Sequence, residues 1–101
     1  MNQDILNEIE YACNKFPHWP ADPIHAVTIL AEEVGELQKA ILQETYLPGI
    51  EGHSSQRVYD EALQVAAMAL RFLTAFNDYE YKPSEQVTVT KIQILEMAEG
   101  A

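Results

Sequence analysis

Two pairs of polar residues in this chain have the spacing and the oxygen atoms needed to bind a divalent metal ion. Glu33 and Glu36 form one pair, and Glu61 and Gln64 form the other. Residues three apart project from the same side of a helix, so each pair presents two oxygen-bearing side chains together. Ligand sets made only of oxygen favour hard ions such as Mg²⁺ or Mn²⁺. The spacing therefore predicts a metal site, provided that the two helices pack against each other.

Two of these carboxylates fall among apolar residues. Glu33 lies about 60° from Leu30 around its helix, inside the apolar sector, and Glu61 is flanked by Met68 and Phe72 around its own. A desolvated carboxylate has to be neutralised by a raised pKa, a cationic partner or a metal ion. Two carboxylates 4 Å apart repel by about 4 kcal/mol at an effective dielectric near 20, so three brought together require a cation.

A structural ion-pair cluster is the competing interpretation of the same residues. Arg57, Arg71 or Lys39 could neutralise the carboxylates, because ion-pair networks also gather charge. Against it, the chain has only six basic residues. Spacing alone leaves both interpretations open.

The elements that carry these residues are expected to be helices. Apolar residues recur with the helical period between three breaks rich in proline or glycine. Each helix has a capping residue at its start, namely Asn2, Asp22 before Pro23, Ser54 or Ser55, and Thr90 with Gln93. The helices should run over about 3–15, 23–45, 55–77 and 91–99.

We expect a single all-α domain over residues 1–101, a helical bundle of three long helices plus a short C-terminal helix. The core stripe of the second helix is predicted to be Val27, Leu30, Val34, Leu37 and Ile41. A domain of this size hides only roughly 60 to 65 % of its unfolded surface. Its core should therefore be completed by homo-oligomerisation.

Charge and composition exclude several classes of partner. The formal net charge is −10, with 16 acidic and six basic residues, which argues against binding to nucleic acid or to an anionic membrane. Cys13 is the single cysteine, and the N-terminus lacks the pattern of a signal peptide. No stretch reaches the roughly 18 uninterrupted apolar residues of a membrane span. We expect a cytoplasmic protein.

The residues EEVGE at 32–36, followed by Glu61 on a second apolar helix, resemble the EExxE and ExxD motifs of the MazG-like all-alpha NTP pyrophosphatases. The resemblance covers residues from about 16 to 77, and it is to the small single-domain members of phages and mobile elements. It implies a helical homodimer or homotetramer that hydrolyses a nucleoside triphosphate, (d)NTP, to (d)NMP and pyrophosphate with Mg²⁺. The biological role would be to remove unwanted nucleotides from the pool.

The family's site residues carry over by position. The resemblance implies that Glu33, Glu36 and Glu61 bind the metal ion, and that Glu32 orients or activates the attacking water, so Glu32 and Glu33 are the catalytic candidates. One position departs from the family pattern, because Gln64 stands where the family has Asp. A glutamine oxygen can bind Mg²⁺, but it lowers the negative charge of the site by one.

Candidate substrate contacts flank the carboxylate helices. The resemblance suggests that the aromatic rings of His18, Trp19 or Phe16 stack on the nucleobase, although Phe16 is better explained as a core residue. Arg57 could meet the triphosphate or form a surface ion pair. His25 could support Glu36. Asn77 and Tyr81 are weaker candidates for sugar contacts.

Three functions are compatible with the sequence. The first is a nucleotide pyrophosphatase. The second is a catalytically weak relative that binds nucleotides or a protein and regulates a process, which the Gln64 departure favours. The third is an acidic DNA mimic, which the net charge permits but which needs its acids on the outside.

Overall fold

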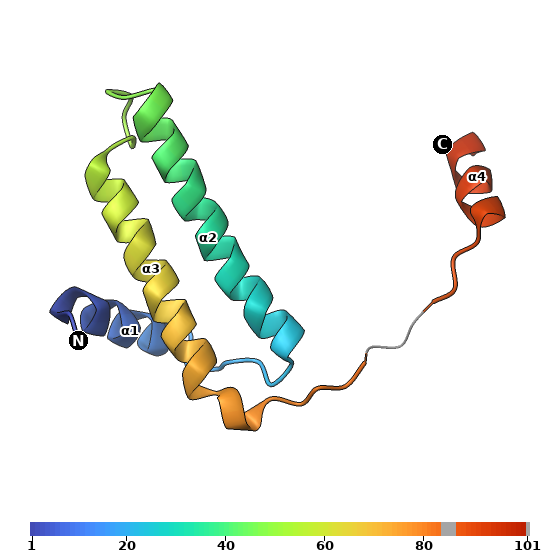
Figure 1. Cartoon of the computed structure of the whole chain (residues 1–101), viewed down its shortest axis with the longest axis horizontal. Coiled ribbons are helices and arrows are strands. Elements are labelled where there is room, and N and C mark those ends of the chain that lie inside the picture. Colours follow the sequence, from blue (N-terminus) through green and yellow to red (C-terminus); the bar gives the residue numbers. More distant parts are fainter. Residues whose placement is uncertain (84–86, 101) are drawn as a thin grey trace.

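The computed structural model of the chain describes residues 1–83 and 87–100. Over these residues it consists of helices and connecting segments, with no strand, which confirms the all-α fold class (Figure 1). The elements in chain order are α1 (Gln3–Lys15), α2 (Pro23–Tyr46), α3 (Ser55–Thr74), the short 3₁₀ helix η1 (Phe76–Asp78) and α4 (Lys91–Glu99).

Each helix starts where its capping residue places it. The side chain of Asn2 accepts from the backbone N–H of Asp4, and that of Asp22 accepts from Ile24. Ser54 caps α3, and Thr90 forms a capping box with Gln93 at the start of α4. These contacts satisfy backbone donors that have no partner inside the helix. The α2–α3 connection contains Gly49 and Gly52 at φ of 83° and 85°, a conformation that favours glycine.

The end of α3 differs from the prediction, because the helix stops at Thr74 rather than near residue 77. The chain continues as η1 and turns back, so that the ring of Tyr79 lies 4.9 Å from that of Phe72. The Tyr79 hydroxyl donates to the Phe72 carbonyl oxygen at 2.8 Å. A continuous helix would carry Tyr79 away from this contact, so the tertiary contact decides where the helix ends.

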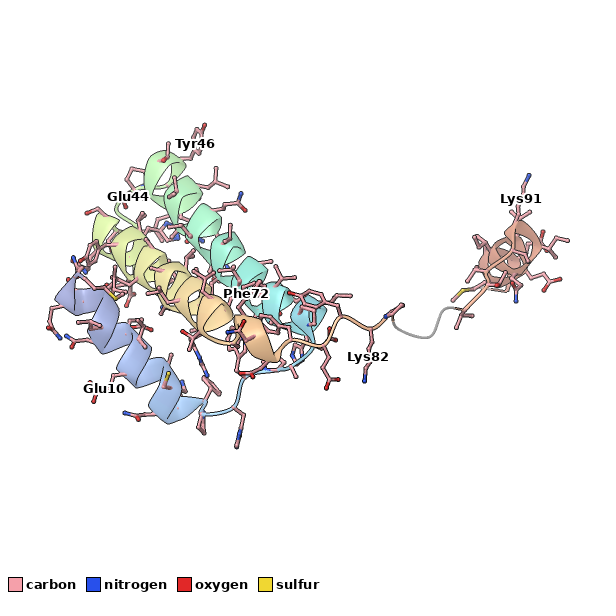
Figure 2. All side chains as sticks on the ribbon, turned by 60° about the horizontal axis from the view of Figure 1, so that its bottom comes forward. Glu10, Glu44, Tyr46, Phe72, Lys82 and Lys91 are labelled. Carbon is pink, nitrogen blue, oxygen red and sulfur yellow. The ribbon has the colours of Figure 1, made fainter. Side chains whose placement is uncertain are left out.

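α3 is the central element of the fold. α2 and α1 pack against different sides of α3, and α1 and α2 do not pack on each other (Figure 1). The three helices thus form an open arrangement rather than a closed bundle. Over the described residues α4 packs on none of them. Side chains such as that of Glu10 on α1 project outward from this arrangement (Figure 2).

The core is small. The buried apolar residues are Ala12, Ala26, Ala40, Ala67, Met68 and Tyr79, and no large side chain among the described residues is fully buried. The predicted core stripe of α2 is wrong in part, because Val27, Val34 and Ile41 are 46 %, 38 % and 46 % exposed. The small side chains of Ala26 and Ala40 are the buried residues of α2 instead. No helix within the described part of the chain is long and apolar enough to cross a bilayer.

Candidate metal and nucleotide site

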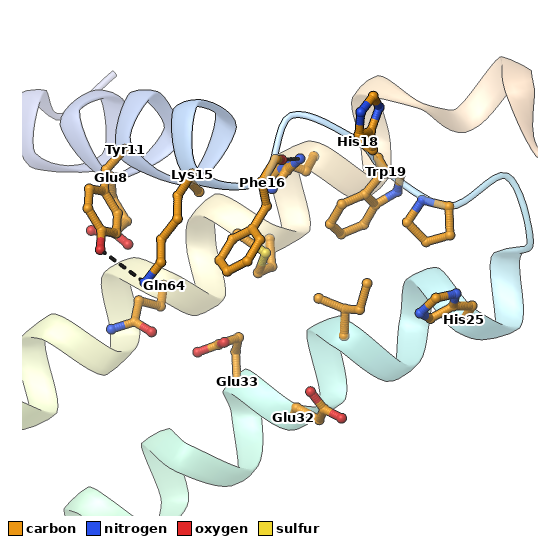
Figure 3. A pocket seen from close by; sticks show the side chains of 15 residues that line it. Glu8, Tyr11, Lys15, Phe16, His18, Trp19, His25, Glu32, Glu33 and Gln64 are labelled. Atoms are coloured by element: carbon orange, nitrogen blue, oxygen red, sulfur yellow. Dashed lines mark hydrogen bonds between the residues drawn. The ribbon is translucent and has the colours of Figure 1, made fainter.

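A cleft of about 900 Å³ opens between α1 and α2, with α3 as its floor (Figure 3). Its apolar lining includes Phe16, Trp19, Ile29 and Met68, and its polar lining includes carboxylates, an amide and basic groups. Ligand sites typically occupy about 300 to 1,000 Å³ and are mostly apolar with a few polar groups. The cleft is therefore large enough for a nucleotide.

Glu33 is the central carboxylate of this cleft. It is half-buried, and its side chain points from α2 into the cleft (Figure 3). Burial raises the pKa of Glu33 above its ordinary value, and repulsion from Glu61, Glu36, Glu32 and Glu8 raises it further. The carboxylates predicted from the sequence are thus close enough to act on one another electrostatically.

Glu8 on α1 is a site residue that the sequence analysis missed. It lines the cleft, and burial raises its pKa, with repulsion from Asp60 and Glu61 adding to the shift. Glu8 lies about 40° from Ala12 around α1, beside the apolar stripe of that helix. Its position beside this stripe is the same signal in the sequence that distinguishes Glu33 on α2. Carboxylates from three helices therefore surround this region, not from two.

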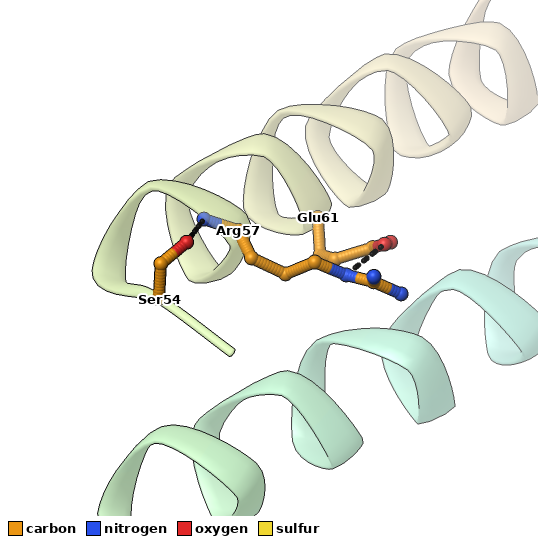
Figure 4. Close-up of polar contacts among 3 residues, drawn as sticks. All are labelled: Ser54, Arg57 and Glu61. Atoms are coloured by element: carbon orange, nitrogen blue, oxygen red, sulfur yellow. Dashed lines mark hydrogen bonds and ion pairs between the residues drawn. The ribbon is translucent and has the colours of Figure 1, made fainter. Parts of the chain in front are cut away.

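Glu61 is buried, with 8 % of its surface exposed, and it has a cationic partner. The Nε of Arg57, one turn earlier on α3, lies 3.4 Å from the Glu61 Oε1 (Figure 4). This ion pair supports the structural interpretation for Glu61. Arg57 does not line the cleft, so the structure does not bring this predicted triphosphate contact to the other substrate-binding candidates.

The predicted metal ligands are only partly brought together. Glu33 and Gln64 line the cleft with Glu32, whereas Glu36 and Glu61 do not. Among the described residues no group of three or more His, Cys, Asp or Glu side chains converges tightly enough to hold a metal ion. The donor chemistry still fits Mg²⁺, because this ion takes one or two carboxylates and completes its shell with waters and substrate phosphates. These residues therefore suit an open site for such an ion rather than a closed cage.

At the entry to the cleft the Trp19 side chain is held by other residues, whereas the His18 side chain is exposed. The Trp19 Nε1 donates to the Tyr79 hydroxyl at 2.9 Å, and the Arg71 guanidinium lies 4.8 Å from the centroid of the Trp19 ring. Arg71 also donates to the Phe16 carbonyl oxygen at 2.6 Å. Trp19 therefore anchors the α1–α2 connection and has one ring face covered. His18 is exposed at the cleft and is free of this constraint.

Two further predictions on the substrate residues have a clear outcome. The expectation that Phe16 closes the core is wrong, because the side chain is 60 % exposed and lines the cleft. The hydrogen bond from the Arg71 guanidinium to the Phe16 carbonyl oxygen holds residue 16 at the surface, where α1 ends. Asn77 lies in η1, exposed, and is not part of the cleft lining.

Comparisons of the chain with protein-family models, with curated proteins and with solved structures found no match.

Proposed function

We propose that the chain is a Mg²⁺- or Mn²⁺-dependent nucleoside triphosphate pyrophosphohydrolase, which converts a (d)NTP and water to a (d)NMP and pyrophosphate in the cytoplasm. The observation that carries the proposal is the position of Glu33, half-buried in a nucleotide-sized cleft and repelled by carboxylates from three helices. A divalent ion bound with a triphosphate would neutralise this charge surplus. The family resemblance of EEVGE adds the reaction type.

Each residue of the site then has a distinct task. Glu33 would bind the ion, with Glu61 behind it adding negative charge, and Gln64 would offer a neutral oxygen from the floor of the cleft. Glu32 is exposed at the cleft beside Glu33, where it can orient a water molecule for attack on the α-phosphorus. The bound ion would supply Lewis acidity at the phosphate oxygens. The cleft would contribute mainly by positioning the reacting groups.

A nucleotide-binding regulator with weak or no turnover is the second candidate function. Gln64 is the observation that favours it, because it lines the cleft at the position where the family it resembles has a charged aspartate. A neutral ligand would hold the ion less tightly, so less of the ion would be in place to stabilise the negative charge of the transition state. Nucleotide binding could remain while turnover is lost.

The decisive experiment measures pyrophosphate release from a panel of NTPs and dNTPs, with Mg²⁺, with Mn²⁺ and without either ion. Turnover that needs the ion and is lost in Glu33→Gln supports the enzyme. Glu10→Gln is the matched control, since it removes the same charge from the outer side of α1. Ion-dependent nucleotide binding without turnover supports the regulator, and neither binding nor turnover refutes both functions.

We also propose that the protein is a homodimer, or a homotetramer of such dimers, joined through an apolar face of the α2–α3 hairpin. On α2 this face consists of Ile24, Val27, Val34, Ile41 and Leu42, which are between 38 % and 65 % exposed. They fall within about 100° of one another around the helix, in a sector that contains no charged residue. On α3 it consists of Ala62, Ala66, Ala69 and Leu73, of which Ala62 and Leu73 are exposed.

These two stripes lie on the same side of the hairpin. On α2 the cleft residue Glu32 and the apolar residue Val34 lie on opposite sides of the buried Ala26. On the helical wheel Ala26 lies between Ile29 and Leu30, which pack against the cluster that contains Ala67 and Met68 of α3. On α3 the cleft residue Gln64 and the apolar residue Ala62 likewise lie on opposite sides of Glu61. Because α2 and α3 run antiparallel, both apolar stripes face away from the cleft and form one continuous surface.

A second copy of the chain fits this surface better than α4 does. α4 has nine residues and is about 13 Å long, whereas α2 has 24 residues and is about 36 Å long. α4 could cover only part of the face, and a second hairpin matches its full length. Two chains of charge −10 repel one another over most of their surface, so an uncharged face is where they can approach.

A further inference from the structure

The cleft has two chemically different ends. Lys15, Gln64 and Glu33 face one another at the end beneath α1 (Figure 3). Trp19 and His25 lie at the other end, where Glu32 is the carboxylate among the described residues that line the cleft. A nucleotide also has two chemically different ends, an anionic triphosphate and an aromatic base. The cleft can therefore distinguish the two orientations of a bound nucleotide.

Lys15 brings a cation to the carboxylate end from the last turn of α1. Its Nζ donates to the Tyr11 hydroxyl at 3.4 Å. The same nitrogen lies 5.6 Å from the centroid of the Tyr11 ring and 5.4 Å from that of Phe16. Two aromatic rings thus hold the ammonium group over the cleft, at distances where cation–π attraction operates. Lys15 makes no ion pair with a carboxylate of residues 1–83 or 87–100.

The other basic residues near the site are already engaged. Arg57 is paired with Glu61 outside the cleft lining. Arg71 lines the cleft, but its guanidinium donates to the Phe16 carbonyl oxygen and covers the Trp19 ring. A nucleoside triphosphate carries three to four negative charges and would enter a cleft that already holds several carboxylates. It needs a positive partner in addition to a metal ion, and Lys15 is placed to provide one.

We propose that Lys15 binds the terminal phosphates of the nucleotide and so fixes its orientation in the cleft. The β- and γ-phosphates lie toward Lys15 and Gln64, and the base lies toward His18 and the exposed face of Trp19. This inference rests on the proposed nucleotide-binding function. Lysine is suited to the role, because its ammonium group is a compact charge with three rotatable donors that can follow a phosphate without a fixed geometry. Lys15 would thus give α1 a role in ligand binding, which the sequence did not predict for this helix.

Lys15→Met removes the charge and keeps the length and most of the apolar volume of the side chain. Lys39→Met is the matched control, because Lys39 is exposed on α2 and does not line the cleft. Both variants and the wild type are titrated with Mg²⁺ and the α,β-methylene triphosphate of the best-bound nucleoside, then with the corresponding monophosphate. We expect Lys15→Met to weaken triphosphate binding at least tenfold, to change monophosphate binding less than twofold, and to be rescued by Lys15→Arg.

The outcomes separate the inference from the function on which it rests. If the wild type binds no nucleotide, the proposed function fails. If the wild type binds the triphosphate analogue and Lys15→Met binds it equally well, only the role of Lys15 is overturned. Equal weakening of triphosphate and monophosphate binding also overturns it, because Lys15 would then not discriminate the terminal phosphates. Thermal unfolding of each variant identifies any loss of folding. If Lys15→Met does not fold, triphosphate binding is compared between Lys15→Arg, which keeps the charge, and Lys15→Gln, which removes it.

Discussion

Val34→Glu tests the proposed dimer at the centre of its apolar face. Val34 lies near the middle of α2, 38 % exposed, with Val27 and Ile41 seven residues to either side. Residues seven apart lie almost above one another on a helix, so the three form one stripe. A glutamate at position 34 would place a carboxylate in the middle of the face in each copy. It would leave the buried side of α2, at Ala26 and Ala40, unchanged.

The size of the effect follows from the exposed surface. Five α2 side chains of the apolar face expose about half of their area, and complete burial of such a side chain contributes about 1.5 to 3 kcal/mol. The face therefore gains about 1 kcal/mol per side chain, or about 10 kcal/mol for two copies. Association costs about 4 to 15 kcal/mol, so the net free energy of dimerisation is small. Loss of Val34 from both copies removes about 2 kcal/mol, and desolvation of two carboxylates adds more.

We therefore expect Val34→Glu to raise the dimer dissociation constant by at least about 100-fold, since each 1.4 kcal/mol is a factor of ten. Sedimentation equilibrium over a series of protein concentrations measures it directly. Asn14→Glu is the control, because it adds the same charge at an exposed site on α1. A wild-type protein that stays monomeric at the highest soluble concentration would refute the dimer, and a dimer unaffected by Val34→Glu would refute this face.

Three other predictions concern the cleft and its anchor. Burial and repulsion raise the pKa of Glu33, so the folded protein binds the proton of the Glu33 carboxyl more tightly than the unfolded chain does. The stability of the fold should therefore fall as the pH rises from the ordinary glutamate pKa through the raised pKa of Glu33. Thermal unfolding across about pH 4 to 8 should show a smaller fall in Glu33→Gln than in the wild type. Gln64→Asp should strengthen Mg²⁺ binding several-fold by calorimetry, and an unchanged titration midpoint would remove Gln64 from the ligands. Tyr79→Phe should lower the unfolding free energy by about 1 to 3 kcal/mol, because the Trp19 Nε1 loses its acceptor; equal denaturation midpoints would contradict this.

The helix starts could be predicted from the sequence because they depend on neighbouring residues. The side chains of Asn2, Asp22, Ser54 and Thr90 each accept from a backbone N–H two or three residues away, as their positions indicated. The end of α3 could not be predicted in this way. It depends on the contact between Tyr79 and Phe72, which forms only after the chain has turned back.

The composition of the core was harder to predict because a helical wheel gives an apolar sector but not its partner. On α2 the apolar sector is wide, and both Val34 and the alanines are compatible with packing. In the structure Ile29 and Leu30 pack against the cluster that contains Ala67 and Met68, Ala26 and Ala40 are buried, and Val34 is left exposed. Likewise Lys15 becomes a cleft residue only because of the way α1 crosses α3, which no spacing within α1 encodes.

The position of Glu33 could be predicted because α2 has three functionally different sides. One side packs on α3 and has Glu33 between the buried Ala26 and Ala40 on the helical wheel, one carries Glu32 at the cleft, and the third is apolar and free of charge. A second copy bound to this third side would contact the α2–α3 hairpin on the face opposite the cleft and would leave the cleft open. The spacing between Glu33 on α2 and Gln64 on α3 would then be set by assembly as well as by the thin core of one chain. Such an assembly would support the thin core of this domain, in which no large side chain of the described residues is fully buried.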